Sequence, residues 1–186
     1  ISLAHGNPFG SLVKYSTKTN QAVARTTLGL FPASMEISTI TGFLYCVNFN
    51  LHGSMKPSNV SVVDPETMTE ITKITTGSMP HGSRLSPDGL FQYSVAMMSG
   101  ELFEIDALDL KVNRVLDLEN KMMSPKKMDD KMMNKNMQDN MVNNDKEKAM
   151  MSSMPNMKHS MVKPTWVIPH PNQNIAYVAG NGSNEV

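Results

Sequence analysis

A chain of 186 residues is long enough to bury a hydrophobic core. Its 17 basic and 17 acidic residues give a formal net charge of 0, which argues against a general nucleic-acid or polyanion binder. No stretch is apolar over the length of a membrane span. Cys46 is the single cysteine, so no disulfide can form within the chain. The unusual component is methionine, with 18 residues.

The N-terminal part of the chain is predicted to form short β-strands. Residues 12–15 and 22–27 are consistent with two paired strands, with Val23 expected in the core. A strand over residues 35–40 should follow, and the apolar residues 44–49 are predicted to be an inner strand of a sheet.

Residues 58–99 form the clearest structural unit of the sequence. The predicted order is a strand over 60–64, a strand around 71–74, a loop over 77–82, a turn at Ser86, Pro87, Asp88 and Gly89, and a strand over 91–96.

This unit recurs on both sides of itself. A tyrosine follows a proline by 13 residues three times, in the pairs Pro32 and Tyr45, Pro80 and Tyr93, and Pro164 and Tyr177. Residues 60–64 also match residues 102–106 with a period of 42, and residues 12–15 are a weaker third copy. A period near 40 residues with several short strands per copy is typical of propeller blades.

The pattern resembles the YVTN-type β-propeller repeat, a family that includes lactonase-like and surface-layer propellers. Its Gly-x-x-Pro loop, its Ser-Pro-Asp-Gly turn and its Tyr-Val strand match residues 77–80, 86–89 and 93–95, the last in a Tyr-Ser-Val form. The resemblance implies an all-β β-propeller with three to four blades visible here and seven in the full protein. It also implies a periplasmic, secreted or cell-surface location. Because Ile1 and Val186 fall inside repeats, we expect the chain to be a fragment.

The repeat pattern divides the chain into three parts. We predict propeller blades over residues 1–119, an insertion over 120–163 that is helical or disordered, and a continuation of the propeller over 164–186. The insertion contains 12 of the 18 methionines and no aromatic residue. These methionines are Met122, Met123, Met128, Met132, Met133, Met137, Met141, Met150, Met151, Met154, Met157 and Met161.

We expect the methionine-rich segment to bind copper. Thioether sulfur is a soft, neutral ligand that suits Cu(I) and competes poorly for zinc, calcium or magnesium. His159 lies between Met157 and Met161 and would add an imidazole with some affinity for Cu(II). In composition the segment resembles the methionine-rich parts of periplasmic copper-handling proteins.

Two other interpretations of the segment stay open. Met133, Met137 and Met141 are spaced by four residues, which would place them on one face of a packing helix. Alternatively, the segment is a polar, disordered loop without a ligand.

Outside the insertion, His81 is a possible site residue in the loop before an inner strand, facing the propeller channel. The equivalent positions hold Ala33 and Thr165, so no ring of histidines is expected. Trp166 is expected to serve packing. The aspartates at strand ends should accept backbone N–H groups in turns, namely Asp64, Asp88, Asp106 and Asp109.

Three functions are compatible with this sequence. The first is an extracytoplasmic binding protein whose insertion holds copper ions and which has no catalytic residues. The second is a propeller enzyme, lactonase-like or similar to nitrogen-oxide reductases, with its site in the channel. The third is a surface scaffold that binds another protein on the propeller face. No nucleic-acid partner and no membrane span are expected.

Overall fold

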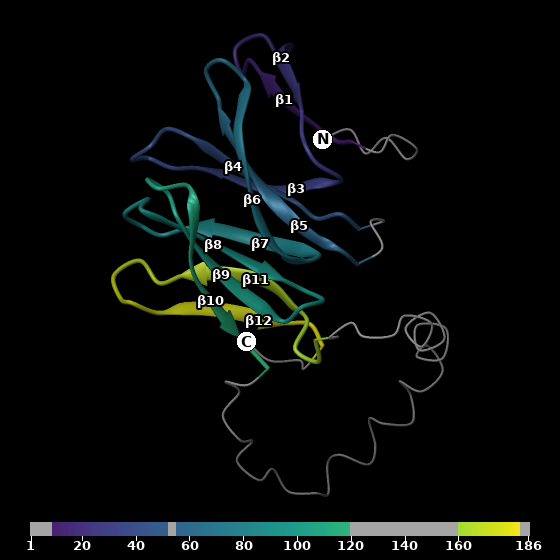
Figure 1. The fold of residues 1–186 in the computed structure, drawn as a ribbon. Coiled ribbons are helices and arrows are strands. Elements are labelled where there is room, and N and C mark those ends of the chain that lie inside the picture. The colour runs from purple at the N-terminus through teal and green to yellow at the C-terminus, as the bar shows by residue number, and fades with distance from the viewer. Residues whose placement is uncertain (1–8, 52–54, 120–159, 183–186) are drawn as a thin grey trace, which may run out of the picture. The chain divides into compact units, whose positions relative to one another are not determined.

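A computed structural model describes residues 9–51, 55–119 and 160–182 (Figure 1). Within these ranges every regular element is a β-strand, and no helix could cross a membrane. The strands are β1 (Ser11–Tyr15), β2 (Ala22–Thr27), β3 (Pro32–Ile37), β4 (Leu44–Asn48), β5 (Pro57–Asp64), β6 (Thr69–Ser78), β7 (Pro80–Leu85), β8 (Phe91–Ala96), β9 (Glu101–Asp106), β10 (Lys111–Asp117), β11 (Pro164–Pro169) and β12 (Ala176–Gly180).

The strands form antiparallel sheets in which sequence neighbours pair. Two sheets are complete four-stranded meanders, β3 to β6 and β7 to β10. Two further sheets have two strands each in the described residues, β1 with β2 and β11 with β12. This arrangement is that of consecutive blades of a β-propeller, and the predicted all-β propeller fold is confirmed.

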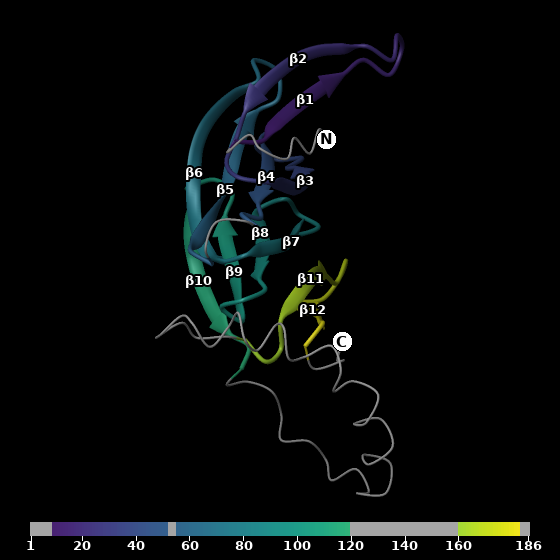
Figure 2. The same cartoon turned by 90° about the vertical axis from the view of Figure 1, so that its right-hand side faces the viewer.

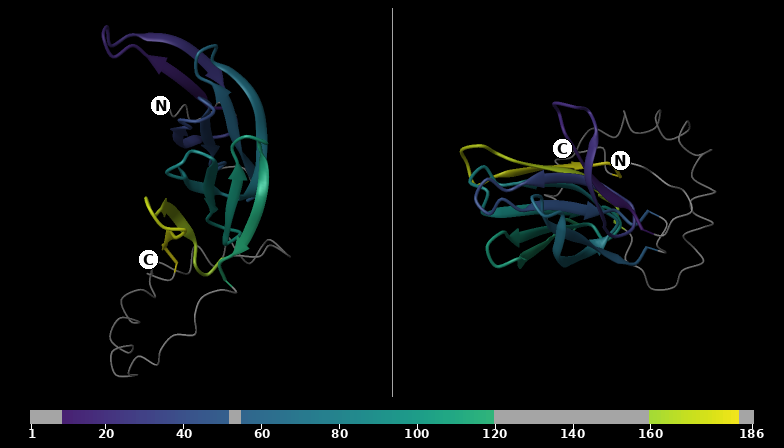
Figure 3. Two further views of the ribbon diagram at one scale, coloured as in Figure 1. Left: turned by 90° about the vertical axis from the view of Figure 1, so that its left-hand side faces the viewer. Right: turned by 90° about the horizontal axis from the view of Figure 1, so that it is seen from above.

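The first strand of each blade lies against the first strand of the next. Figure 2 shows β3, β7 and β11 along one side and the outer strands β6 and β10 along the other, and Figure 3 shows the same order from the opposite side. The prediction that residues 44–49 form an inner strand of a sheet is confirmed. They form β4, the second of the four strands, whose apolar character reflects pairing on both edges and burial of both faces.

The entry to each first strand repeats with the same geometry. Each first strand begins at the repeated proline, and the residue before this proline has a left-handed backbone in all three copies. Its φ is 54° at Phe31, 53° at Met79 and 46° at Lys163. Its carbonyl accepts a hydrogen bond from the residue 18 positions later in each case, namely Phe49, Met97 and Asn181. The third copy of this geometry is therefore made by Lys163, directly before Pro164.

The core lies between the blades. One cluster joins Tyr45, Val60 and Val62 of the β3–β6 blade to Ile105 and Ala107 of the β7–β10 blade. The Tyr45 hydroxyl, fully buried, donates a hydrogen bond of 3.0 Å to the Ala107 carbonyl. Face-to-face burial of this kind provides most of the stability of neighbouring blades.

Two similar clusters hold the short sheets in place. Leu12 and Leu28 pack against the β3–β6 blade with Val63, in a cluster separate from that of Val60 and Val62. Val167 packs on the β7–β10 blade with Val95 and Leu102.

Several local predictions need correction. Val23 is 57% exposed because Ala24, on the opposite face of β2, packs toward the core. Residues 77–82 are not a loop. They end β6 and begin β7, with the reversal made by the left-handed Met79 alone. The strand predicted over residues 35–40 is β3, which ends at Ile37.

Candidate functional site

The predicted copper ligands lie almost entirely outside the described residues. Only Met161 of the predicted set is described. The other members fall outside, namely Met122, Met123, Met128, Met132, Met133, Met137, Met141, Met150, Met151, Met154, Met157 and His159. Met161 is 76% exposed, and its position in the repeat corresponds to Gly29 and Gly77. Its thioether is thus available to solvent at the point where the chain re-enters the propeller.

The two ends of the methionine-rich segment meet at one point of the propeller. The Glu119 carboxylate accepts a hydrogen bond of 2.6 Å from the Ser160 hydroxyl and one of 3.1 Å from the Val162 N–H. Ser160 is buried, and its N–H donates to the Met98 carbonyl. Burial alone would raise the pKa of Glu119, but hydrogen bonds from Ser160, Val162 and Met161 together lower that pKa below its ordinary value.

His81 lies on strand β7, and its ring bridges three blades. Nδ1 is 3.0 Å from the Thr165 carbonyl of β11. Because a carbonyl only accepts, Nδ1 carries the proton, and Nε2 is the nitrogen able to accept a hydrogen bond or bind a metal. The ring stands edge-on to Phe49 and to Trp166, with centroid distances of 4.9 and 5.5 Å.

Neighbouring side chains reinforce this junction between inner strands. Ser34 of β3 donates to the His81 carbonyl at 2.8 Å, and Arg84 lies over the Trp166 ring at 5.4 Å. A Cβ at Gly82 would come within 2.4 Å of the Thr165 carbonyl oxygen, so only glycine allows β7 and β11 to approach this closely. Trp166 thus packs as predicted, although it is 41% exposed.

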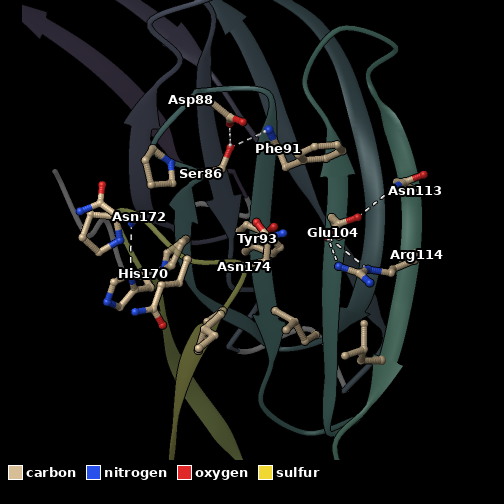
Figure 4. A pocket seen from close by; sticks show the side chains of 18 residues that line it. Ser86, Asp88, Phe91, Tyr93, Glu104, Asn113, Arg114, His170, Asn172 and Asn174 are labelled. Atoms are coloured by element: carbon tan, nitrogen blue, oxygen red, sulfur yellow. Dashed lines mark hydrogen bonds and ion pairs between the residues drawn. The ribbon is translucent and has the colours of Figure 1, made fainter.

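A pocket of about 830 Å³ opens between strands β8 to β10 and the β11–β12 sheet (Figure 4). Tyr93, Leu102, Glu104 and Leu116 lie along one wall, and the 169–176 turn forms the other. His170 is part of that turn, where its Nδ1 accepts a hydrogen bond from the Asn172 N–H at 3.1 Å. His170 therefore helps to hold the turn between β11 and β12.

A charged cluster is part of the lining of this pocket. Glu104 is buried, and its carboxylate accepts hydrogen bonds from Asn113 at 2.7 Å and from the Arg114 guanidinium at 2.5 and 3.1 Å. Burial and the nearby Glu104 charge raise the pKa of Tyr93 above its ordinary value. In the previous blade the equivalents of Glu104 and Arg114 are Val62 and Thr72, so the charge pair is specific to this blade. This charge pair was not predicted from the sequence. Comparing the two copies of the repeat would have indicated it, because Glu104 stands where the previous blade has Val62.

The described residues do not assemble a metal centre. None of them forms a group of three or more His, Cys, Asp or Glu side chains placed to hold an ion. Cys46 is buried in β4, and desolvation raises the pKa of its thiol to about 12, so it stays protonated and is a poor ligand. The predicted turn roles of Asp64, Asp88 and Asp106 are confirmed, since each accepts backbone N–H groups. Asp109 instead pairs with Lys111 at 2.7 Å.

No family model and no curated protein matches the chain. Solved structures do. Hydrazine synthase from Kuenenia stuttgartiensis is 25% identical with a TM-score of 0.50, over 56% of this chain and 29% of that one. The Dos1 propeller is 15% identical with a TM-score of 0.46, over 59% of this chain and 32% of that one. The dihydro-heme d1 dehydrogenase NirN in complex with DHE is 17% identical with a TM-score of 0.45, over 62% of this chain and 24% of that one. The chain thus spans about a third or less of the length of these structures, and the hydrazine synthase match supports the fold.

Proposed function

We propose that this chain is an extracytoplasmic β-propeller binding protein whose methionine-rich segment binds copper, with Cu(I) preferred. The observation that carries the proposal is the position of that segment. Residues 120–159 leave and re-enter the propeller at the Glu119–Ser160 contact, and the repeat geometry continues undisturbed on either side. The propeller then carries the segment, and the sequence of the segment can be specialised for binding a ligand.

The chemistry of the segment supports copper over other metals. Its methionines supply many neutral sulfur donors, whereas hard cations need oxygen donors and zinc prefers thiolate or imidazole. The exposed Met161 extends the donor set to the edge of the propeller. The resemblance to YVTN-type propellers supports a periplasmic, secreted or cell-surface location.

A competition titration of the 186-residue chain against a chromophoric Cu(I) chelator tests the proposal. The matched control replaces the twelve methionines between residues 122 and 161 with leucine, which keeps the apolar bulk and removes the sulfur. We expect the wild type to take Cu(I) from the chelator and the leucine variant to bind at least tenfold more weakly. Equal binding by both chains would reject thioether coordination.

A propeller enzyme is the second candidate, favoured by the match to hydrazine synthase and by the fixed Nδ1 hydrogen bond of His81, which leaves Nε2 as the reactive nitrogen. This activity would be lactonase-like or similar to nitrogen-oxide reduction. Turnover of a lactone or of nitrite that is lost in His81→Ala would favour this candidate over a binding protein.

A further inference from the structure

A cluster of polar side chains is buried where the two complete blades meet. Its members are Thr76 at the end of β6, Ser83 of β7, and Gln92 and Ser94 of β8. The blades on either side, β3 to β6 and β7 to β10, each have all four of their strands within the described residues. The cluster is therefore enclosed by complete blades.

The repeat gives every member of this polar cluster an apolar counterpart in the neighbouring contacts between blades. In the preceding contact, 48 residues earlier, the counterparts pack together and are Leu28, Met35, Leu44 and Cys46. In the following contact the counterparts also pack together and are Leu118, Val167, Ala176 and Val178. Because the same positions are in contact on both sides, the four polar side chains are expected to lie together as well.

Hydrogen bonds within the protein satisfy only part of the polar cluster. Ser83 Oγ donates a hydrogen bond of 3.0 Å to the Tyr93 carbonyl and accepts one from Gln92 Nε2. Since the single hydroxyl hydrogen of Ser83 is used on that carbonyl, Ser83 can only accept from the Gln92 amide, and Gln92 Oε1 is left over. Among the described residues, Gln92 Oε1, Ser94 Oγ and Thr76 Oγ1 have no hydrogen-bond partner.

Unpartnered polar atoms are unfavourable in a protein interior. Each loses its hydrogen bonds to solvent on folding and regains them only if a partner is present. Apolar side chains occupy the same place in both neighbouring contacts, so the blade architecture does not require polar groups there. The polar cluster therefore indicates a bound partner that supplies the hydrogen bonds.

We infer that at least one water molecule is bound between the two complete blades, shared by Gln92 Oε1, Ser94 Oγ and Thr76 Oγ1. The cluster has no charged side chain, which disfavours an ion as the ligand. The amide oxygen only accepts and the two hydroxyls donate or accept, so water, which does both, matches them. A buried water typically makes about three hydrogen bonds, and three unpartnered atoms are present. This site does not depend on copper binding by the methionine-rich segment.

Counting the long-lived internal water molecules of the 186-residue chain tests the inference. Oxygen-17 magnetic relaxation dispersion detects water that stays bound for longer than the protein takes to tumble. One variant takes the residues of the preceding contact, with Thr76→Leu, Ser83→Met, Gln92→Leu and Ser94→Cys. A second variant takes those of the following contact, with Thr76→Leu, Ser83→Val, Gln92→Ala and Ser94→Val. We expect each variant to hold at least one such water fewer than wild type.

Ser58→Ala is the matched control, because Ser58 is also buried but its hydroxyl already donates to the Asn48 carbonyl at 2.6 Å. Its water count should equal that of wild type. A crystal structure of the wild-type chain decides the question even if neither cluster variant folds. It should show a water within hydrogen-bond distance of Gln92 Oε1 and of at least one of the two unpartnered hydroxyls. A wild-type crystal structure without that water, or equal counts in wild type and the folded cluster variants, would overturn the inference.

Discussion

The Glu119 carboxylate lies 2.6 Å from the hydroxyl of Ser160, a residue 41 positions later in the chain. This contact closes the 40 residues between them and returns the chain to the propeller. Ser160 Oγ also accepts a hydrogen bond of 2.8 Å from the N–H of Lys163, the residue directly before Pro164. The two residues therefore set both the exit of the methionine-rich segment and the start of β11.

Loss of this contact should weaken the fold in a pH-dependent way. The pKa of Glu119 is lowered in the folded protein from its ordinary value of 4.5, so the ionised group stabilises the fold above that pH. The contribution is lost as the pH falls through the lowered, folded-state pKa. We expect Glu119→Gln to melt below wild type at pH 7, and the difference to shrink below about pH 4.5.

Ser160→Ala provides the matched control, because it removes hydrogen bonds without removing a titrating group. Ser160 is buried, and losing its two side-chain hydrogen bonds should cost about 1–3 kcal/mol. A Glu119→Gln melting difference that is constant from pH 3 to pH 7 would contradict the role given to the carboxylate.

The methionine-rich segment should be dispensable for folding. Replacing residues 120–159 with two glycines joins two residues whose side chains already form a hydrogen bond. We expect the melting temperature to change by less than about 4 °C, which corresponds to roughly 1 kcal/mol for a domain of this size. Circular dichroism checks the fold, and Cu(I) binding should disappear in the same variant. An unfolded deletion variant would show that the segment is part of the structure.

His81 should matter for stability and not for copper. His81→Ala removes the hydrogen bond to the Thr165 carbonyl and the ring contacts with Phe49 and Trp166. We expect a loss of about 1–3 kcal/mol in the free energy of unfolding, measured in urea, with Cu(I) affinity unchanged. A fall in Cu(I) affinity with unchanged stability would instead make His81 a ligand.

Gly82 should tolerate no side chain. Alanine there meets the Thr165 carbonyl oxygen and the Trp166 Cα at 2.4 and 2.6 Å, so β7 and β11 must move apart at a cost of about 1–3 kcal/mol. Gly42→Ala is the comparison. Its φ of 73° makes alanine unfavourable by about 1 kcal/mol, but no atom lies within 4 Å of the added Cβ. Denaturant midpoints should therefore rank wild type, Gly42→Ala, then Gly82→Ala, and a reversed order of the two variants would contradict the close-approach argument.

Repetition made most of the fold predictable from the sequence. The spacing from Pro32 to Tyr45, from Pro80 to Tyr93 and from Pro164 to Tyr177 located the first two strands of each blade, and the structure gives those strands the same register. The order of strands within a blade was less accessible. Residues 44–48 and 60–63 are similarly apolar because each belongs to a central strand, and hydropathy alone does not tell the second strand from the third.

The site was harder to predict, because its contacts join residues far apart in the chain. Glu119 and Ser160 carry no motif, and Glu104 with Arg114 stands out only when the blades are compared position by position. His81 was identified as a candidate by its residue type, but its hydrogen bond to the Thr165 carbonyl depends on the packing of one blade on the next. Thr165 is 84 residues away.

X-ray absorption spectroscopy of the copper-loaded 186-residue chain tests the central claim most directly, because it reports the atoms bound to the metal. The account predicts Cu(I) with sulfur in its first coordination shell, and the loss of that sulfur signal when the twelve methionines are replaced by leucine. A first shell of nitrogen and oxygen alone, or a sulfur signal that persists in the leucine variant, would contradict it.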